Sequence, residues 1–288
     1  MTQSNTGAPH RFFGRFCDVI DHVYAHLDDD LSLDRLADIA CLSPFHFHRI
    51  YHALTGETLA ETVRRLRFHR AAGDLLEGHL PMQRVALRAG YSSEAAFNRA
   101  FKKTFGLTPG HYRNVRQSLH APRATTAEEI PMPNVTIQEI DAIDLLLIRH
   151  QGDYMQIGSA FEHLNHWAAS QQLLTPETRS FGLYWDDPSA VPVDELRAAA
   201  CMSGPANAAA GEVDAMRLNG GRYACLLHVG PYAELEKSYD ALYRGWLPQS
   251  GEEPADAPCA EEYLNNPRDT PPMALETLIM MPLANREA

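Results

Sequence analysis

Glu261 is the residue whose type and position most directly suggest chemistry, because it breaks an internal repeat. The stretches 184–188 (YWDDP) and 263–267 (YLNNP) are two copies of one pattern, and superposing them aligns Glu261 with Gly182. A carboxylate among aromatic rings holds an organic cation by charge, and the rings add cation–π and apolar contacts. The break in the repeat therefore makes Glu261 a candidate ligand-binding residue in the groove between the two repeats. We expect the lining to come from Trp185, Tyr154, Tyr232 and Tyr263.

A second set of polar residues lies in two similar stretches of the N-terminal half. Arg49 and Arg99 hold equivalent places in the two copies, since Gly56 and Gly106 recur at the same spacing. Arginine and asparagine read base edges through paired hydrogen bonds, whereas lysines more often hold phosphates. We expect DNA contacts from His48, Arg49, Ser93, Glu94, Asn98, Arg99, Lys102 and Lys103.

Both stretches predict an amphipathic helix that presents these residues. Ser43 and Ser93 are suitable N-caps, and Phe97, Phe101 and Phe105 recur at helical spacing. Gly56 and Gly106 suit helix C-termini that need a left-handed residue. Between the copies, residues 61–78 predict a linking helix. Its arginines (Arg64, Arg65, Arg67 and Arg70) are expected to hold phosphates.

The stretch 89–113 (AGYSSEAAFNRAFKKTFGLTPGHYR) and its earlier copy resemble the double helix-turn-helix of AraC/XylS-type transcription regulators, over residues 12–116. The resemblance implies that one monomer reads two successive major-groove segments. It also places Phe45 near DNA, where an apolar contact with a thymine methyl group is expected. Glu94 has two interpretations: it accepts a hydrogen bond from a cytosine amino group, or it is an edge residue without a role.

The charge distribution agrees with a DNA-binding N-terminal half. Residues 1–123 carry 16 Lys and Arg against 12 Asp and Glu, and residues 124–288 carry 9 against 25, which gives +4 and −16. Within residues 49–116 the counts are 12 and 5. Basic charge concentrated on the motif is typical of a nucleic-acid footprint. The acidic half is expected to avoid DNA and to bind something else.

The C-terminal half is a second duplication. The segments 150–154 (HQGDY) and 228–232 (HVGPY) match residue by residue, and each follows an apolar, strand-like run. A helix with a tryptophan, Trp167 or Trp246, follows each segment, and both tryptophans are expected in the core. The pattern predicts two strand-helix-strand-strand units packed about a pseudo-twofold axis in an α+β fold.

This half resembles the GyrI-like effector-binding domain, over residues 134–283. The resemblance implies that Glu261 attracts cationic, amphipathic molecules, although Ala260 replaces the aromatic residue that usually precedes this glutamate. Three alternatives remain open. Glu261 with Tyr263 or Tyr154 could activate water in a hydrolase, the half could bind a protein partner, and Tyr154 and Tyr232 could serve only as helix caps.

The sequence thus predicts a multi-domain chain. It comprises an all-α double helix-turn-helix DNA-binding domain (11–116), a linker (117–133) and an α+β small-molecule-binding domain (134–285). We expect a cytoplasmic, non-enzymatic regulator that binds double-stranded DNA and a small-molecule effector, with RNA polymerase as a candidate partner. No cofactor and no membrane contact are expected. Five scattered cysteines predict reduced thiols rather than metal ligands, and His48 and His52 are expected to face DNA rather than zinc.

Overall fold

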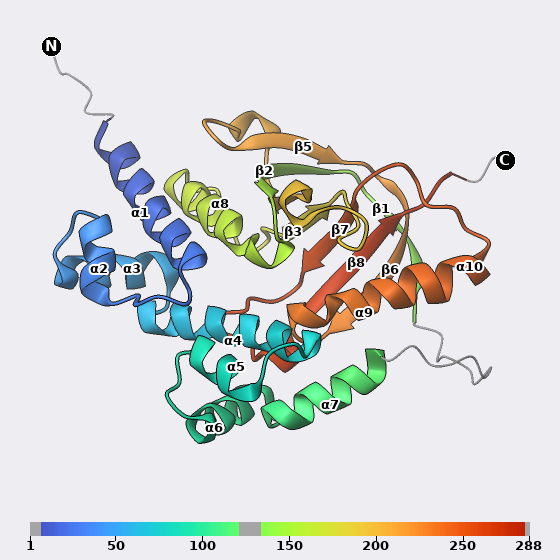
Figure 1. Cartoon of the computed structure of the whole chain (residues 1–288). Coiled ribbons are helices and arrows are strands. Elements are labelled where there is room, and N and C mark those ends of the chain that lie inside the picture. Colours follow the sequence, from blue (N-terminus) through green and yellow to red (C-terminus); the bar gives the residue numbers. More distant parts are fainter. Residues whose placement is uncertain (1–6, 121–133, 286–288) are drawn as a thin grey trace, which may run out of the picture.

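The computed structural model describes residues 7–120, here called the helical part, and residues 134–285, called the sheet part (Figure 1). Most of the predicted linker, residues 121–133, lies outside the described residues, and residues 117–120 belong to a helix. No described helix combines the length and the apolar character needed to cross a membrane. The helical part contains α1 (Gly7–Ala25), α2 (Leu33–Ile39), α3 (Pro44–Thr55), α4 (Leu59–Glu77), α5 (Met82–Arg88), α6 (Glu94–Phe105) and α7 (Pro109–His120).

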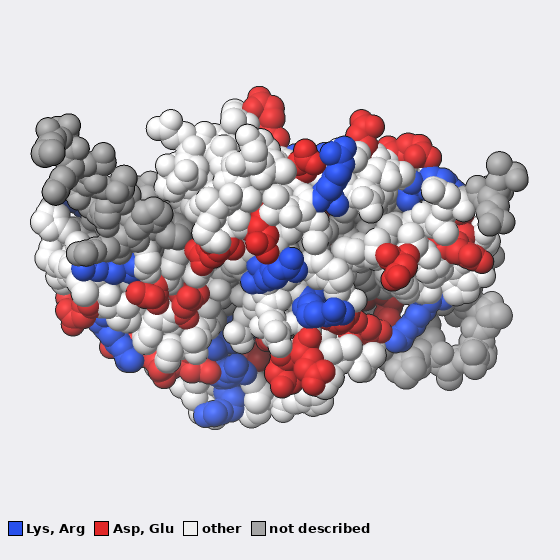
Figure 2. All heavy atoms as spheres, turned by 90° about the horizontal axis from the view of Figure 1, so that it is seen from above, with Lys and Arg blue, Asp and Glu red and all other residues white. Residues whose placement is uncertain are grey.

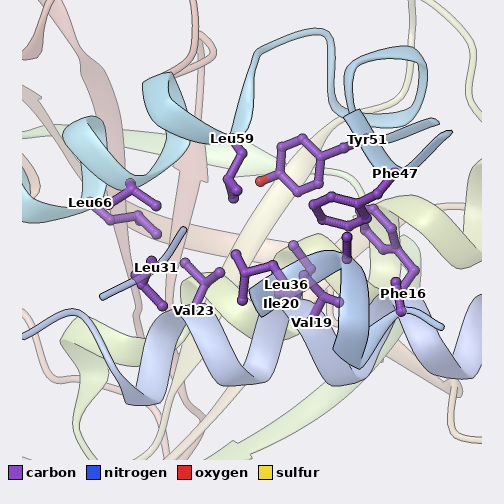
Figure 3. Packing of buried hydrophobic residues seen from close by; sticks show 13 residues of the cluster. Phe16, Val19, Ile20, Val23, Leu31, Leu36, Phe47, Tyr51, Leu59 and Leu66 are labelled. Atoms are coloured by element: carbon purple, nitrogen blue, oxygen red, sulfur yellow. The ribbon is translucent and has the colours of Figure 1, made fainter. Parts of the chain in front are cut away.

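Helix α4 joins two small helical modules and contributes to the core of each. Its first half packs Leu59 and Leu66 with residues of α1, α2 and α3 in one apolar cluster (Figure 3). Its second half packs Phe68 and Leu75 with residues of α5, α6 and α7 in another. Because one continuous helix carries both cores, it sets the distance between the two modules. The predicted all-α pair of repeated units with a linking helix is confirmed.

The residues that were predicted to begin and end α3 and α6 do so. Ser43 and Ser93 are the N-caps of α3 and α6, and each accepts a hydrogen bond from a backbone N–H three residues later. Gly56 and Gly106 end these helices with φ values of 77° and 75°. A side chain would strain the backbone in this left-handed region, so glycine is favoured there.

The sheet part is built on one antiparallel eight-stranded sheet, which is curled (Figure 1). Its order is β1-β6-β8-β7-β3-β4-β2-β5. The strands are β1 (Thr136–Ile140), β2 (Ile143–Gln151), β3 (Ser180–Tyr184), β4 (Arg197–Ser203), β5 (Asp214–Leu218), β6 (Gly221–Val229), β7 (Cys259–Tyr263) and β8 (Glu276–Pro282).

The strand order shows the predicted internal symmetry and adds one strand to each repeat. The predicted units correspond to β2, β3 and β4 and to β6, β7 and β8. The additional strands β1 and β5 begin at Thr136 and Asp214, which are equivalent positions of the two repeats. Strand β1 pairs with β6 and β5 pairs with β2. Each repeat therefore receives its outer strand from the other, which ties the two repeats into one domain.

Helices cover one face of this sheet. Helix α8 (Gly158–Ser170) lies over the first repeat, where Trp167 joins the core. Helix α9 (Leu235–Asp240) continues through a π-helical stretch (Ala241–Trp246) into α10 (Leu247–Ser250) over the second repeat. The opposite face buries a cluster of strand residues inside the curl. Side chains that alternate along a strand therefore reach two different environments.

Candidate ligand site and nucleic-acid interface

Glu261 lies on the helix-covered face of the sheet, at the centre of the repeat. Strands β3 and β7 pair antiparallel with Gly182 directly opposite Glu261, so the pseudo-twofold axis passes between these two residues. The side chain of Glu261 is buried, with 3% of its surface exposed. A Cβ atom at Gly182 would lie 2.7 Å from Cε2 of Tyr184 and 2.9 Å from Oη of Tyr263. Because Gly182 has no side chain, the rings of Tyr184 and Tyr263 can occupy the space beside it.

Tyrosine hydroxyl groups surround the carboxylate of Glu261. The hydroxyl of Tyr239 donates to Oε1 and that of Tyr263 donates to Oε2, both at 2.8 Å. The hydroxyl of Tyr184 lies 2.7 Å from that of Tyr263. Since the proton of Tyr263 is used on Glu261, Tyr184 is the donor in this pair. Each carboxylate oxygen thus accepts one tyrosine hydrogen bond and keeps further acceptor capacity for an incoming cation.

The surrounding rings are repeat partners of one another. Tyr184 of β3 is equivalent to Tyr263 of β7, and Phe161 of α8 is equivalent to Tyr239 of α9. The ring centroid of Phe161 lies 5.4 Å from that of Tyr263, in an edge-on arrangement. Sequence reasoning missed Tyr184, Tyr239 and Phe161 as neighbours of Glu261. The repeat alignment contained the signal, since the aromatic residues of equivalent strands and helices meet around the axis.

Burial changes the acid–base behaviour of this group. It raises the pKa of Glu261 to about 7, although the hydrogen bonds from Tyr239 and Tyr263 act in the opposite direction. Burial, together with the nearby carboxylate, raises the pKa of Tyr184 and Tyr263 well above the usual value, so both stay protonated donors. The site therefore changes between neutral and anionic near neutral pH, and its anionic form lacks a cationic partner among the residues that hydrogen-bond to it.

The predicted lining residues are only partly brought together. Tyr263 contacts Glu261 directly, and the ring of Tyr232 lies 5.4 Å from that of Tyr263. Tyr154 reaches the group only through the ring of Tyr184, at 4.9 Å, and its hydroxyl donates to backbone carbonyls. Trp185 is not brought to the site. It packs with the cluster on the opposite face of the sheet, because alternate residues of a strand point to opposite sides.

Tyr232 is also a contact between the two parts of the chain. Its ring meets the imidazole of His69, on α4, at a centroid distance of 5.8 Å. Burial lowers the pKa of His69 to about 4, which keeps it neutral. One tyrosine therefore connects the neighbourhood of Glu261 to the helix that spaces the two helical modules.

A cluster of four charged side chains lies at the same boundary. Arg65 of α4 donates to Glu57 at 2.5 Å and lies 3.9 Å from Glu162 of α8. Arg268 pairs with Glu162 and lies 3.6 Å from Glu57. Both glutamates are more than nine-tenths buried. Removing one partner of such a buried pair costs about 3–5 kcal/mol, because it leaves an uncompensated charge.

Two further polar contacts hold the parts together. The hydroxyl of Tyr112, on α7, donates to Glu234 Oε1 at 2.8 Å. His163 of α8 lies 3.1 Å from Asp21 of α1. Burial favours a neutral His163, but interactions with Asp21 and Cys17 outweigh it and raise the pKa of His163 to about 10.

The boundary is incompletely packed. A cleft of about 430 Å³ lies between α4, the end of α1 and the loop before α8. Its walls include His69 and Gly73 of α4, Tyr24 of α1, and Asp153 and Met155 of the sheet part. The two parts thus meet through separate contacts around a polar cleft.

The predicted DNA-binding residues lie on the outer faces of α3 and α6 and at their N-termini. Phe45 is 65% exposed, and the guanidinium of Arg49 lies 5.6 Å from the centroid of its ring. Asn98 is half-buried, and the remaining members are exposed: His48, Arg49, Ser93, Glu94, Arg99, Lys102 and Lys103. The arginines and lysines of this set form no ion pair with any described residue, so their charges are available to a polyanion.

The linking helix differs from the prediction. Arg65 belongs to the buried charge cluster, and Arg67 donates to the backbone carbonyls of Leu27 and Asp29. Arg70 donates to Asp28 Oδ1 at 2.7 Å. The fold already engages guanidinium donors of all three, which argues against the expectation that they hold phosphates. Only Arg64 of the four is exposed.

The face of the molecule seen from above carries a mixture of charges. Figure 2 shows Asp and Glu in separate groups with Lys and Arg between them. This face lacks a continuous basic surface within the described residues. A polyanion is therefore expected at the outer faces of α3 and α6 rather than here.

Comparison with known proteins identifies both parts. Residues 133–284 match the GyrI-like small molecule binding domain, and residues 36–115 match a helix-turn-helix domain. Over 94 residues the chain is 34% identical to the HTH-type transcriptional regulator YbfP of Bacillus subtilis (strain 168), covering 33% of this chain and 32% of YbfP. Over 96 residues it is 35% identical to the Right origin-binding protein of Escherichia coli (strain K12), covering 33% of each.

These matches span about a third of the length of each relative. Among solved structures, the EcmrR–DNA complex covers 94% of this chain and 98% of that chain, with 15% identity and a TM-score of 0.47. The match to the GyrI-like model covers more than half of the chain. The chain therefore belongs to the GyrI-like small molecule binding domain family, and it carries this domain behind an AraC-type helix-turn-helix region.

Proposed function

We propose that this chain is a DNA-binding transcription regulator whose output changes when a cationic, amphipathic small molecule binds at Glu261. The observation that carries the proposal is the position of Tyr232. Its ring lies against Tyr263, which holds the Glu261 carboxylate, and also against His69 of α4. A change at the carboxylate is therefore two side chains away from the helix that spaces the DNA-binding modules.

In the DNA-binding half, α3 and α6 enter two successive segments of the major groove. Arg49 and Arg99 occupy equivalent exposed places and are assigned to base edges, while Lys102 and Lys103 are assigned to phosphates. Tandem reading by one chain is supported by α4, which joins the cores of both modules. RNA polymerase is a candidate partner of the DNA-bound form.

In the ligand-binding half, the site selects a cation with apolar groups. A cation near Glu261 favours the ionised carboxylate, which burial disfavours in its absence. Rings of Phe161, Tyr184 and Tyr263 supply apolar and cation–π contacts. Small inorganic cations lack the apolar surface that these rings would cover.

Ligand binding then reaches α4 by two routes. A ligand that displaces the Tyr263 ring alters its contact with Tyr232 and, through it, with His69. Arg268 follows Tyr263 closely in the chain and takes part in the buried cluster with Glu57. A ligand shifts an equilibrium only if it binds one state more tightly than the other. We therefore assign the two states of the regulator to two arrangements of the boundary between the helical part and the sheet part.

DNA binding of the full chain, with and without tetraphenylphosphonium, tests the proposal. We expect the cation to change the affinity for a selected duplex several-fold in the wild type. Glu261→Gln should weaken cation binding by about 100-fold or more and reduce the response accordingly, whereas His69→Ala should retain cation binding and reduce the response. The uncharged control is triphenylphosphine oxide, which should have little effect. An identical response in Glu261→Gln would refute the role of this carboxylate.

Base and phosphate contacts are separated by selecting bound sequences. Arg49→Ala and Arg99→Ala should each relax preference at one half of the site, by about 1–3 kcal/mol per base pair. Lys103→Ala should weaken all sequences by a similar factor and lower the salt dependence. Unchanged base preferences in both arginine variants would remove direct readout by these residues.

A second candidate function is favoured by the pKa of Glu261. A carboxyl group with a pKa of about 7 beside tyrosine hydroxyls suits general acid–base catalysis in a hydrolase. Benzoylcholine, a cationic aromatic ester, distinguishes the two functions. A regulator binds it and leaves it intact, whereas a hydrolase releases benzoate, and Glu261→Gln abolishes the release.

A further inference from the structure

Groups that bind transition metals meet where α1 of the helical part lies against α8 of the sheet part. The ligand atoms of Cys17, His163 and Glu212 all lie within 4.8 Å of one another. Asp21 lies one turn after Cys17, so both project from the same face of α1. Its Oδ1 is 3.1 Å from Nε2 of His163. One sulfur, one nitrogen and two oxygen donors thus converge from three segments of the chain.

We propose that Cys17, Asp21, His163 and Glu212 bind one divalent transition-metal ion, with Zn²⁺ as the best match. Zinc takes four thiolate, imidazole and carboxylate ligands in a tetrahedron. Its bond lengths of about 2.0–2.3 Å place neighbouring donor atoms about 3.3–3.6 Å apart. The ligand atoms of Cys17, His163 and Glu212 lie within 4.8 Å of one another, and that of Asp21 lies 3.1 Å from His163. Glu212 and Asp21 are surface side chains, so they can rotate to close the remaining gap.

The buried ring nitrogen of His163 provides an independent observation. Its Nε2 atom is shielded from solvent and forms no well-aligned hydrogen bond with any described residue, despite the nearby carboxylate of Asp21. The ion pair with Asp21 at 3.1 Å is therefore poorly directed, and a metal ion coordinated by both side chains would engage this nitrogen along its lone pair.

The site has a consequence for the whole molecule. Cys17 and Asp21 belong to the first helical module, whereas His163 and Glu212 belong to the sheet part. An ion held by both fixes α1 against α8 and adds a link between the two parts. It is separate from Glu261, so metal binding would act as a second input, whether or not an organic cation binds.

Cobalt titration of the full chain, after treatment with a chelator, tests the site. Co²⁺ bound by a thiolate gives a near-ultraviolet charge-transfer band, and we expect it to saturate at one ion per chain. The band should disappear in Cys17→Ser and persist in Cys41→Ser, the matched control, because Cys41 is exposed and outside the cluster. Saturation without the band, or the same band in Cys17→Ser, would overturn the proposal.

Two surface variants keep the test independent of folding. Cys17 is buried, so its substitution can disturb packing, whereas Asp21→Asn and Glu212→Gln alter exposed groups. Each substitution should weaken Zn²⁺ binding by at least about 10–100-fold, because a loss of this size follows even from removing a group that only orients a metal ligand. The circular dichroism spectrum should stay unchanged. Zinc affinity equal to the wild type in both variants would exclude these carboxylates and refute the four-ligand site.

Discussion

Glu261→Gln should abolish the pH dependence of cation binding to the full chain. The wild-type carboxyl group has a pKa of about 7 in the folded protein, and a cation binds to its ionised form. Below this pH each bound cation must displace one proton, so the dissociation constant should rise tenfold for each unit of pH. Glutamine keeps the size and the acceptor oxygen but carries no proton that titrates in this range.

The expected magnitudes follow from burial. At pH 7 half of the groups are ionised, so from pH 7 to pH 5 the wild type should lose affinity by about 50-fold, which is about 2.3 kcal/mol. Above pH 7 its affinity should be nearly constant. At pH 8, two charges about 4 Å apart interact by about 4 kcal/mol at an effective dielectric constant of 20, against about 1 kcal/mol in water. The difference predicts a loss of about 100-fold or more in Glu261→Gln.

The same group affects the free energy of unfolding with a defined sign. Its pKa is raised from 4.5 to about 7 by folding, so the folded state holds the proton more tightly. The stabilisation of the folded state that comes from this tighter proton binding is fully present below pH 4.5 and is lost as the pH rises to about 7. The wild type should therefore lose about 3 kcal/mol relative to Glu261→Gln across this window.

Calorimetric titration with tetraphenylphosphonium between pH 5 and pH 8 measures the binding, and urea denaturation measures the stability. Glu262→Gln is the matched control. It makes the same change one residue away, on the opposite face, where Glu262 pairs with Arg179 at 2.6 Å. The control should retain the wild-type pH profile of cation binding. A wild-type affinity that does not vary with pH would refute the reasoning, as would a Glu261→Gln profile that still does.

Other substitutions test the packing. Gly182→Ala should destabilise the chain by about 1–3 kcal/mol in urea denaturation, because its Cβ would lie 2.7 Å from the ring of Tyr184; unchanged stability would contradict this close approach. Gly106→Ala should cost about 1 kcal/mol at φ 75°, whereas Gly110→Ala, a helical control without near neighbours, should cost nothing. Tyr112→Phe should cost about 1–3 kcal/mol by losing its hydrogen bond to the sheet part, and wild-type stability would show that this contact is dispensable.

Some features followed from short-range patterns. The caps Ser43 and Ser93 and the glycines Gly56 and Gly106 were predictable because a helix end is decided by a few consecutive residues. The pairing of Gly182 with Glu261 was foreshadowed by the repeat alignment, since equivalent strands of two repeats meet at the axis that relates them.

Other features depended on contacts that spacing does not show. The exchange of β1 and β5 between the repeats was not predicted, because a repeat pattern shows equivalence and not which strands pair. The arginines of α4 matched a phosphate-binding pattern, yet Arg67 reaches carbonyl groups in a distant stretch of the chain, before α2. A guanidinium group serves either purpose, and only its neighbours in space decide between them.

The sequence by itself determined the two duplicated halves, the ends of α3 and α6, the faces that carry Arg49 and Arg99, and the single acidic residue at the pseudo-twofold axis. These features follow from periodicity and from differences between the repeats, and both can be read directly from the sequence. Tertiary structure alone decided that Tyr239 and Tyr263 hold Glu261 and that α4 meets Tyr232. These contacts arise where surfaces of separate elements pack, so burial, the shifted pKa of Glu261 and the boundary between the two parts depend on the complete fold.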